Sequence, residues 1–322
     1  MTRPWLSVVM PTYNGERYLR ETFESLVAQE ERGFECVVID GGSTDATRAI
    51  IDEYSRVLEV RLFIQPEFPN WIGKTNFGFR QAAAEHVCML HHDDLWNAGR
   101  AGAVRRALAA HPDAALVLHP STLIDPDGKA VGQWSCPLEP GRSYPPQEML
   151  ERLLVQNFIS VPSPTFRRDA ALEVGGVDPA LWYTGDWDFY LKLAATGPTV
   201  YLGEPLSSFR LHGGSLTVTG SANSVDFRRQ LDTVLDRHIA AIDDDRVRQR
   251  VQRTARASND VNSALAAALH GSYTQLPRAL GAVIALGPLG WRRYLEYSRI
   301  GERVTSRIRA RRSLRAGTRS AS

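Results

Sequence analysis

The sequence predicts an α/β fold in which a mostly parallel sheet carries helices on both of its faces. Over the first 95 residues, short apolar runs alternate with amphipathic helical segments, the order that builds a parallel sheet. Acidic residues follow the second and the fourth apolar run, at the sheet edge where open α/β folds bind their ligands. From about residue 225 onward the sequence is rich in Arg, Asp and Ala and predicts helices alone. We therefore expect an α/β domain over residues 1–224 and a helical appendage over residues 225–322.

The boundaries of the first elements follow from the residues that flank them. Pro11 is expected to end the first strand, and Asn14 to cap the helix behind it. After the second strand, Asp40 and two glycines turn the chain, and Ser43 or Thr44 is expected to cap the second helix. The sequence predicts strands at residues 6–10, 36–39, 60–64 and 87–90, an irregular stretch at 66–78 and a helix at 79–85.

Residues 100–224 continue with elements that are less regular. The turn signal at residues 125–128 (DPDG) predicts a hairpin over residues 122–134, and residues 135–150 form a Pro-rich connection. Further helices are predicted at 100–110, 148–156 and 186–195, and further strands at 115–119 and 159–166.

Composition excludes several classes of protein. With 322 residues and 43% hydrophobic content, the chain can bury a large core and is neither disordered nor fibrous. Its longest uncharged apolar stretches span 13 residues, too few for a bilayer-spanning helix of about 20. The N-terminus lacks a signal-peptide pattern, so the mature chain is expected to start at Met1. Three widely spaced cysteines offer neither a disulfide framework nor a metal pair, and a reducing cytoplasm is the expected location.

The net charge of +2 hides an uneven distribution. Residues 292–322 contain ten Arg and two Glu, a net charge of +8, which leaves the preceding 291 residues at −6. A basic tail suits either a solvated surface or contact with an anionic membrane; nucleic acid is not an expected partner. The apolar stretch 279–291, followed by Arg292 and Arg293, suits an interfacial helix at a membrane. It equally suits packing against the rest of the chain or against a second copy.

Two adjacent aspartates are the first candidates for chemistry. Asp93 and Asp94 directly follow the fourth predicted strand, and carboxylates at a strand end hold hard divalent cations such as Mn²⁺ or Mg²⁺. A metal there would neutralise a bound diphosphate. Taken alone, two adjacent aspartates are weak evidence, and a loop-capping or solvated pair is the simpler interpretation.

Six motifs, in order, resemble the family 2 inverting glycosyltransferases of the GT-A fold, a Rossmann-like architecture. The resemblance extends over roughly residues 5–220. The matching segments are residues 7–14 (SVVMPTYN), 38–45 (VIDGGSTD), 76–78 (NFG), 90–96 (LHHDDLW), 175–178 with 185–188 (GGVD and GDWD), and 210–212 (RLH). Each motif is weak on its own, but six in this order and spacing are specific.

The resemblance implies a nucleotide site and a metal site. The base would be bound by the Pro11, Thr12 and Tyr13 loop and by Asp40, and His91 stands at the position associated with the ribose. Lys74, in the stretch before the metal motif, is the candidate contact for the diphosphate. Asp93 is the expected metal ligand together with His212, and Asp94 is the alternative to Asp93.

Asp186 has two interpretations. An aspartate that opens a helix is most simply an N-cap. The resemblance implies that Asp186 is instead the general base, since Asp188 lies two residues further on and faces elsewhere on a helix. The aromatic residues Trp182 and Tyr183 are the candidates for contact with the acceptor.

The resemblance implies a metal-dependent, inverting, hexosyltransferase-type enzyme. It would move a sugar from a nucleoside diphosphate-sugar, UDP favoured over GDP, to a saccharide or lipid-linked acceptor in cell-surface polysaccharide or glycolipid assembly. Such an enzyme would be cytoplasmic or peripheral at the inner face of the membrane. His91, Gly41 and Gly185 depart from the family pattern, which keeps a non-catalytic nucleotide- or sugar-binding relative as an alternative. A nucleotidyltransferase is less favoured, because no Gly-rich phosphate loop follows the first strand, and no GxGxxG indicates a dehydrogenase.

Overall fold

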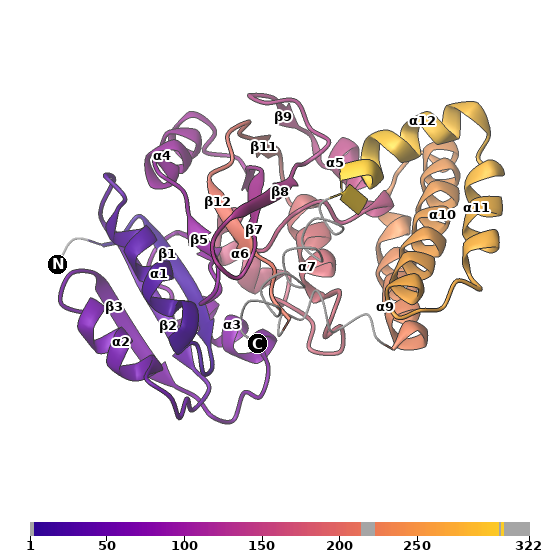
Figure 1. Ribbon diagram of the computed structural model, residues 1–322. Helices are drawn as coiled ribbons and strands as arrows, with labels where there is room; N and C mark the ends of the chain where they lie inside the picture. Colours follow the sequence, from indigo (N-terminus) through magenta and orange to yellow (C-terminus); the bar gives the residue numbers. More distant parts are fainter. Residues whose placement is uncertain (1–2, 214–222, 303, 306–322) are drawn as a thin grey trace.

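The computed structural model describes residues 3–213, 223–302 and 304–305, and two sheets form its centre (Figure 1). The larger sheet has eight strands in the order β3-β2-β1-β4-β10-β6-β11-β9, and the smaller has four in the order β5-β12-β7-β8. The strands are β1 Leu6–Thr12, β2 Phe34–Asp40, β3 Glu59–Ile64, β4 His86–Met89, β5 Leu95–Trp96, β6 Leu116–Leu118, β7 Ser121–Ile124, β8 Ala130–Trp134, β9 Ser143–Tyr144, β10 Thr165–Arg167, β11 Thr199–Tyr201 and β12 Ser207–Arg210. The helices are α1 Glu16–Val27, α2 Thr47–Tyr54, α3 Trp71–Gln81, α4 Arg100–Ala110, α5 Pro146–Val155, α6 Arg168–Glu173, α7 Gly185–Ala194, α9 Ser224–His238, α10 Asp245–Leu269, α11 Leu276–Ile284 and α12 Gly287–Ser298, with a 3₁₀ turn at Ile239–Ala241.

Strands β3, β2, β1 and β4 are parallel, and helices cover both of their faces. Val8 and Cys36 pack with residues of α1 and α2 on one face. Val9 and Val37 pack with residues of α3 on the other face. Because both faces are buried, β1 and β2 are continuous apolar runs, and this is why they could be predicted.

The first strand continues past the proline that was predicted to end it. Pro11 pairs with Ile39 in the parallel ladder to β2, and the strand ends at Thr12. The ladder to β4 on the other side ends earlier, at Val9. At Pro11, one side of β1 therefore has no ladder partner among the described strands. Because proline has no backbone N–H to donate, this is a position where it costs no ladder hydrogen bond.

The predicted helix caps are also wrong, because the capping side chains are used between loops. Asn14, at φ 45°, accepts a hydrogen bond from the backbone N–H of Thr44, 2.9 Å away. The hydroxyl of Ser43 bonds to the carboxylate of Asp40 and accepts from the backbone N–H of Asn14. Helices α1 and α2 consequently start later than predicted, with Gly15 and Ala46 as their N-cap residues. These contacts tie the loop after β1 to the loop after β2.

Residues 66–78 were expected to be irregular, but most of them form α3. Asn70 caps this helix by accepting from the N–H of Gly73, and the helix ends at Gln81, so the predicted helix at 79–85 is misplaced. Two glycines, Gly73 and Gly78, lie inside the helix. At Gly78 a Cβ atom would collide with the side chains of Val9 and Ile39. The glycine thus allows α3 to approach the sheet closely.

The other predictions for residues 100–195 are mostly confirmed. Helix α4 and the β7–β8 hairpin lie where expected. The strand predicted at 159–166 is reduced to the three residues of β10, and α6 was not predicted.

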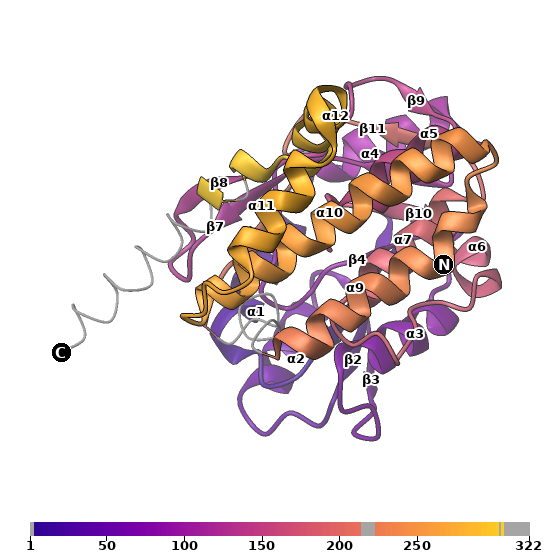
Figure 2. The ribbon, with the colours of Figure 1, turned by 90° about the vertical axis from the view of Figure 1, so that its right-hand side faces the viewer.

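The C-terminal helices pack on the α/β part over a shared core. Phe227 and Leu231 of α9 and Val251 of α10 belong to the same buried cluster as Leu153 of α5 and Leu191 of α7. Figure 2 looks onto this face, which α9, α10, α11 and α12 cover. The start of α9 agrees with the boundary predicted at residue 224, and the division into two domains stays a prediction. None of the helices in the described ranges is long and apolar enough to cross a membrane.

All three cysteines are free and buried. Cys36 and Cys88 lie in β2 and β4 within the core under α1 and α2. Cys136 follows β8, and its thiol donates a hydrogen bond to the carbonyl oxygen of Phe158. Burial raises the pKa of this thiol, and the positive charge of Arg299 offsets part of the rise.

The close approach of α3 to the sheet predicts the effect of substituting Gly78. We expect Gly78→Ala to lower the free energy of unfolding by about 1–3 kcal/mol, because the added methyl group overpacks the core against Val9 and Ile39. Gly281 is the matched control, since it lies within α11 with open space around it. Gly281→Ala should raise stability by about 0.5–1 kcal/mol through helix propensity. Urea unfolding of both variants measures the difference, and equal effects would contradict the packing argument.

Candidate active site

A cavity of about 540 Å³ lies at the carboxyl ends of β1 and β4 and extends to the C-terminal helices. This volume is within the range of about 300–1,000 Å³ that is typical of small-molecule sites. Residues from several segments line it: 11–13 at the end of β1, 91–94 in the loop after β4, 156–158 directly after α5, Asp186 of α7, 210–212 at the end of β12, and Ser298, Arg299 and Glu302. Segments distant in the sequence thus meet in one space.

The acidic pair predicted from the sequence lies in the loop after β4. Asp94 is buried, and its Oδ1 accepts from the backbone N–H of Arg210 at 2.9 Å. Asp93 Oδ2 lies 2.9 Å from Nε2 of His212. Burial and the neighbouring charge of Asp93 raise the pKa of Asp94 well above its ordinary value. Burial opposes ionisation of Asp93 as well, but the hydrogen bond with His212 and the nearby imidazoles bring its pKa below the ordinary value.

His91 joins this pair. Its ligand nitrogen and one carboxylate oxygen each from Asp93 and Asp94 all lie within 4.8 Å of one another. Burial lowers the pKa of His91 to about 4, so the imidazole is neutral at neutral pH, the form that ligates metals. Within the described part of the chain, His91 Nε2 and Asp94 Oδ2 are buried without a hydrogen-bond partner. Two orphaned lone pairs and an ionised carboxylate fit a divalent cation.

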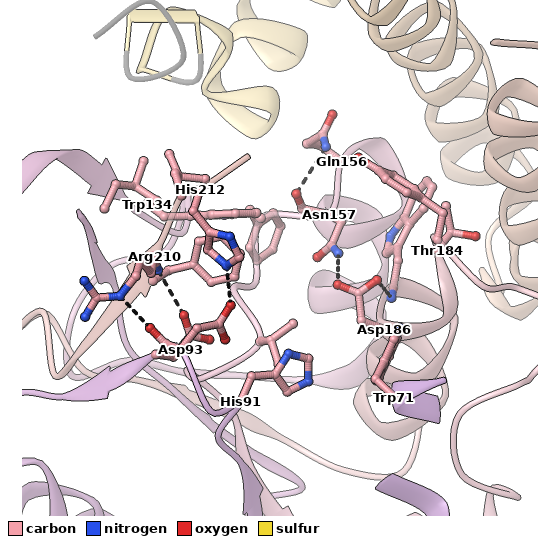
Figure 3. Close-up of a pocket in the computed structure, with 18 of the residues that line it drawn as sticks. Trp71, His91, Asp93, Trp134, Gln156, Asn157, Thr184, Asp186, Arg210 and His212 are labelled. Carbon is pink, nitrogen blue, oxygen red and sulfur yellow. Dashed lines mark hydrogen bonds and ion pairs between the residues drawn. The ribbon is translucent and has the colours of Figure 1, made fainter. Parts of the chain in front are cut away.

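Arg210 fixes the acidic loop from the second sheet. Its guanidinium is fully buried, and Nε donates to the carbonyl oxygen of Asp93 at 2.9 Å. Nη2 forms an ion pair with Glu21 at 2.7 Å, and the guanidinium lies 4.6 Å from the ring centre of Tyr18. Figure 3 shows Arg210 and His212 on the same side of Asp93, with His91 on the other.

The end of β1 and the residue that follows it also line the cavity. Tyr13 is 53% exposed, so its ring is available for stacking. Lys74 of α3 donates to the carbonyl of Thr12 at 3.3 Å and lies 5.4 Å from the ring centre of Tyr13. Burial lowers the pKa of the Lys74 ammonium. The structure thus brings Pro11, Thr12, Tyr13 and Lys74 to the cavity, and their contact with a nucleotide stays a prediction.

Asp40 lies behind the end of β1 and is not among the residues described as lining the cavity. Its carboxylate is fully buried, accepts from the backbone N–H of Ser43 and pairs with Arg48 at 3.2 Å. The base contact expected for Asp40 stays a prediction.

Asp186 lies in the first turn of α7 and is not the N-cap, which is Thr184. One carboxylate oxygen accepts from the backbone N–H of Trp187 at 2.8 Å, and the other accepts from Nδ2 of Asn157 at 3.1 Å. Burial raises the pKa of Asp186 to about 6, and these two hydrogen bonds limit the rise. In Figure 3, Asp186 lies across the cavity from Asp93 and His212.

Asp188 faces away from Asp186, as predicted from the helical spacing. It is buried beside His238 and Lys192, with contacts of 2.9 and 2.7 Å. Asp186 is therefore the carboxylate that α7 contributes to the cavity lining.

Of the two aromatic residues predicted to contact the acceptor, one lines the cavity and the other does not. Tyr183 lines the cavity and packs edge-on against Phe227, with ring centres 5.0 Å apart. Trp182 is used elsewhere: its indole N–H donates to Asp226 at 2.7 Å.

Sequence reasoning missed Asn157 and the contribution of the C-terminal segment. Asn157 precedes Asp186 by 29 residues in a stretch that was expected to lead into a strand. Arg299 and Glu302 belong to a segment that composition predicted only as helix. No local pattern places these residues beside the cavity; only the packing of α5, α7 and α10 does.

Comparison with known sequences identifies relatives. The model of the family described as "Glycosyl transferase family 2" matches residues 7–174. An uncharacterized protein of Mycobacterium tuberculosis is 28% identical over 218 residues, covering 64% of this chain and 59% of that protein. An uncharacterized glycosyltransferase of Nostoc is 27% identical over 219 residues, covering 65% of this chain and 66% of that protein. The chain thus spans about three fifths to two thirds of the length of these relatives.

Solved structures share the fold. TarS 1–349 of Staphylococcus aureus in complex with UDP-GlcNAc superposes with a TM-score of 0.64 at 17% identity, covering 98% of this chain and 92% of that chain. The mannosyltransferase PcManGT of Pyrobaculum calidifontis, in complex with GDP-Man and Mn²⁺, gives a TM-score of 0.53 at 18% identity over 96% of this chain and 88% of that chain. The predicted GT-A fold with C-terminal helices is confirmed.

The buried carboxylate of Asp186 predicts a pH-dependent stability. Because burial raises the folded-state pKa to about 6, above about 3.9 in the unfolded chain, the stability of the wild-type protein should fall as the pH rises from about 4 to 6. Asp186→Asn lacks this titration. We expect its stability relative to wild type to increase by about 2 kcal/mol between pH 4 and pH 7.

Urea unfolding at several pH values measures this change. Asp52, whose side chain is 75% exposed in α2, provides the control substitution Asp52→Asn. A relative stability of Asp186→Asn that does not change with pH would show that the carboxylate is not buried as described.

Proposed function

Because the chain belongs to glycosyltransferase family 2, we propose that it is a metal-dependent, inverting hexosyltransferase. It transfers a sugar from a nucleoside diphosphate-sugar to an acceptor hydroxyl. The observation that carries the proposal is the single cavity in which the cluster of His91, Asp93 and Asp94 faces Asp186. A group that can hold a diphosphate and a group that can take a proton are thereby available on opposite sides of one substrate.

The nucleotide belongs at the end of the cavity formed by the loop after β1. The exposed ring of Tyr13 can stack on the base, and the ammonium of Lys74, which burial leaves poorly hydrated, can meet a phosphate oxygen. TarS was solved with UDP-GlcNAc and superposes more closely than PcManGT with GDP-Man, which supports UDP over GDP as the nucleotide.

A divalent cation, Mn²⁺ or Mg²⁺, fits the acidic loop. Asp93 and Asp94 would hold it, with His91 and His212 as the nearby nitrogen ligands. When bound, the cation supplies positive charge to the diphosphate oxygen that leaves. The protein's part is to keep one carboxylate ionised, through the hydrogen bond between Asp93 and His212, and to keep His91 neutral.

Asp186 is the proposed general base. A pKa of about 6 leaves its carboxylate ionised at neutral pH and still basic enough to accept a proton. As the acceptor oxygen attacks the anomeric carbon, its proton passes to Asp186, and the bond between the anomeric carbon and the diphosphate oxygen breaks. Attack from the face opposite the diphosphate inverts the configuration, which NMR of the anomeric proton in the product can verify.

The acceptor belongs between Asp186 and the C-terminal segment. Tyr183, Asn262 and Arg299 line this part of the cavity and offer an aromatic face, an amide and a guanidinium. Such groups bind hydroxyl-rich ligands. We infer a saccharide or lipid-linked acceptor, used in cell-surface polysaccharide or glycolipid assembly at the cytoplasmic face of the membrane.

Calorimetric titration with UDP and with GDP, in the presence of Mn²⁺ or a chelator, tests the donor and metal assignments. We expect UDP to bind with Mn²⁺ and to bind at least about tenfold more weakly with chelator, because the diphosphate then lacks its counter-charge. Asp93→Asn should lose the metal-dependent binding, whereas Asp186→Asn should retain it. Metal-independent binding in the wild type would contradict the metal assignment, and binding of neither nucleotide would contradict the donor assignment.

The pH profile of sugar transfer tests the role of Asp186. Activity should rise through pH 6 as the carboxylate ionises. Asn157→Leu removes a hydrogen bond that favours the ionised form, so the acidic limb should move up by about one pH unit. Asn157→Asp places a like charge beside Asp186 and should move it further in the same direction. An unchanged limb in both variants would show that Asp186 is not the titrating base.

A further inference from the structure

Helices α11 and α12 carry an exposed apolar surface. Of the thirteen large apolar side chains that are exposed in the described part of the chain, seven lie between residues 273 and 295. We define the apolar face by six of them: Leu276, Leu280, Ile284, Leu289, Trp291 and Leu295. Scattered exposed apolar residues are ordinary, but a concentration of them on two consecutive helices indicates a binding surface.

The exposure follows from how the two helices pack. Helix α11 buries Ala279 against the rest of the protein. Leu276, Leu280 and Ile284, four residues apart, form a separate stripe along the helix. Helix α12 turns Tyr294 and Ser298 inward and leaves Leu289 82% exposed. Figure 2 shows both helices on the outside of the helical layer, beyond α10.

Positive charge accompanies the apolar face. Arg292 and Arg293 follow Leu289 by three and four residues, so they share its side of α12. Residues 271–299 contain four Arg, of which Arg278 lies 3.4 Å from Asp260 and Arg299 pairs with Glu302 at 2.5 Å. The one acidic residue of this segment, Glu296, lies 3.5 Å from Arg152, so Arg292 and Arg293 carry the positive charge of the face. The sequence from Arg292 to its end has a net charge of +8, against −6 for the residues before it.

We propose that the apolar face and its arginines bind the surface of an anionic lipid bilayer. Leucine and tryptophan side chains would enter the interfacial region while the guanidinium groups meet lipid phosphates. A second copy of the chain fits less well. A symmetric pair would bring the same cationic patch against itself, and the repulsion would oppose association.

The surface adjoins the candidate active site. The cavity lining includes Ser298, the last residue of α12, and also Arg299 and Glu302, which follow it in the sequence. In Figure 3 the yellow C-terminal ribbon lies above Trp134. A membrane bound at α12 would therefore present its headgroups to the acceptor end of the cavity. This last step rests on the proposed function; the binding of lipid does not.

Vesicle sedimentation of the full chain tests the proposal. The probes are vesicles of phosphatidylcholine and vesicles that also contain phosphatidylglycerol. Wild-type protein should sediment with the anionic vesicles and remain in solution with the neutral ones. The triple variant Leu280→Ser, Leu289→Ser, Leu295→Ser should partition at least about tenfold less, since each leucine side chain contributes about tenfold when buried. Arg292→Glu with Arg293→Glu should reduce binding to anionic vesicles by roughly tenfold or more.

Controls separate surface effects from unfolding and from failure of the proposed function. Val57→Ser and Arg56→Glu change exposed residues behind α2 and should leave sedimentation unchanged. Calorimetric binding of nucleotide to each variant reports on the cavity independently. Equal sedimentation of wild type and variants, or equal binding to neutral vesicles, overturns the proposal. A wild-type dimer in light scattering that the leucine variant dissociates, without lipid binding, assigns the face to a second copy and also overturns it.

Discussion

The buried guanidinium of Arg210 is the contact on which the site depends. Two adjacent carboxylates repel each other, and burying a charge costs several kcal/mol unless a partner compensates. Arg210 supplies a backbone N–H to Asp94 and a guanidinium N–H to the carbonyl of Asp93, from a strand 116 residues further along the chain. The shape of the acidic loop therefore depends on the docking of the second sheet against the loop after β4. His212, two residues beyond Arg210, reaches Asp93 by the same docking.

The fold around the site could be predicted where the signal is local. Buried parallel strands are largely apolar runs, so β1, β2 and β4 were found within one or two residues. The errors arose where tertiary contacts override local preference. Asn14 and Ser43 bond across two loops instead of capping helices, and Gly78 is required by close packing inside α3 rather than marking a loop.

The same division holds for the site. Most of the residues that line the cavity at the carboxyl ends of β1 and β4 belong to motifs that the sequence reveals. Asn157, Asn262 and Arg299 could not be predicted, because their place depends on how α5, α10 and the end of α12 pack. Opposite pKa directions at Asp93 and Asp186 arise in the same way. Desolvation raises the pKa of both carboxylates, but at Asp93 the hydrogen bond with His212 and the nearby imidazoles outweigh it.

The reactivity of the three buried cysteines can report whether part of the protein unfolds while the rest stays folded. Cys36 and Cys88 lie in the central strands, whereas Cys136 follows β8 and belongs to the buried cluster to which α9 and α10 contribute. A detachment of the C-terminal helices, α9 and α10 included, that leaves the sheet intact would make one thiol reactive toward alkylating reagents and keep two protected. Loss of the whole core would expose all three together. The ratio of the labelling rates therefore distinguishes a helical layer that moves as its own cooperative unit from one that unfolds with the sheet.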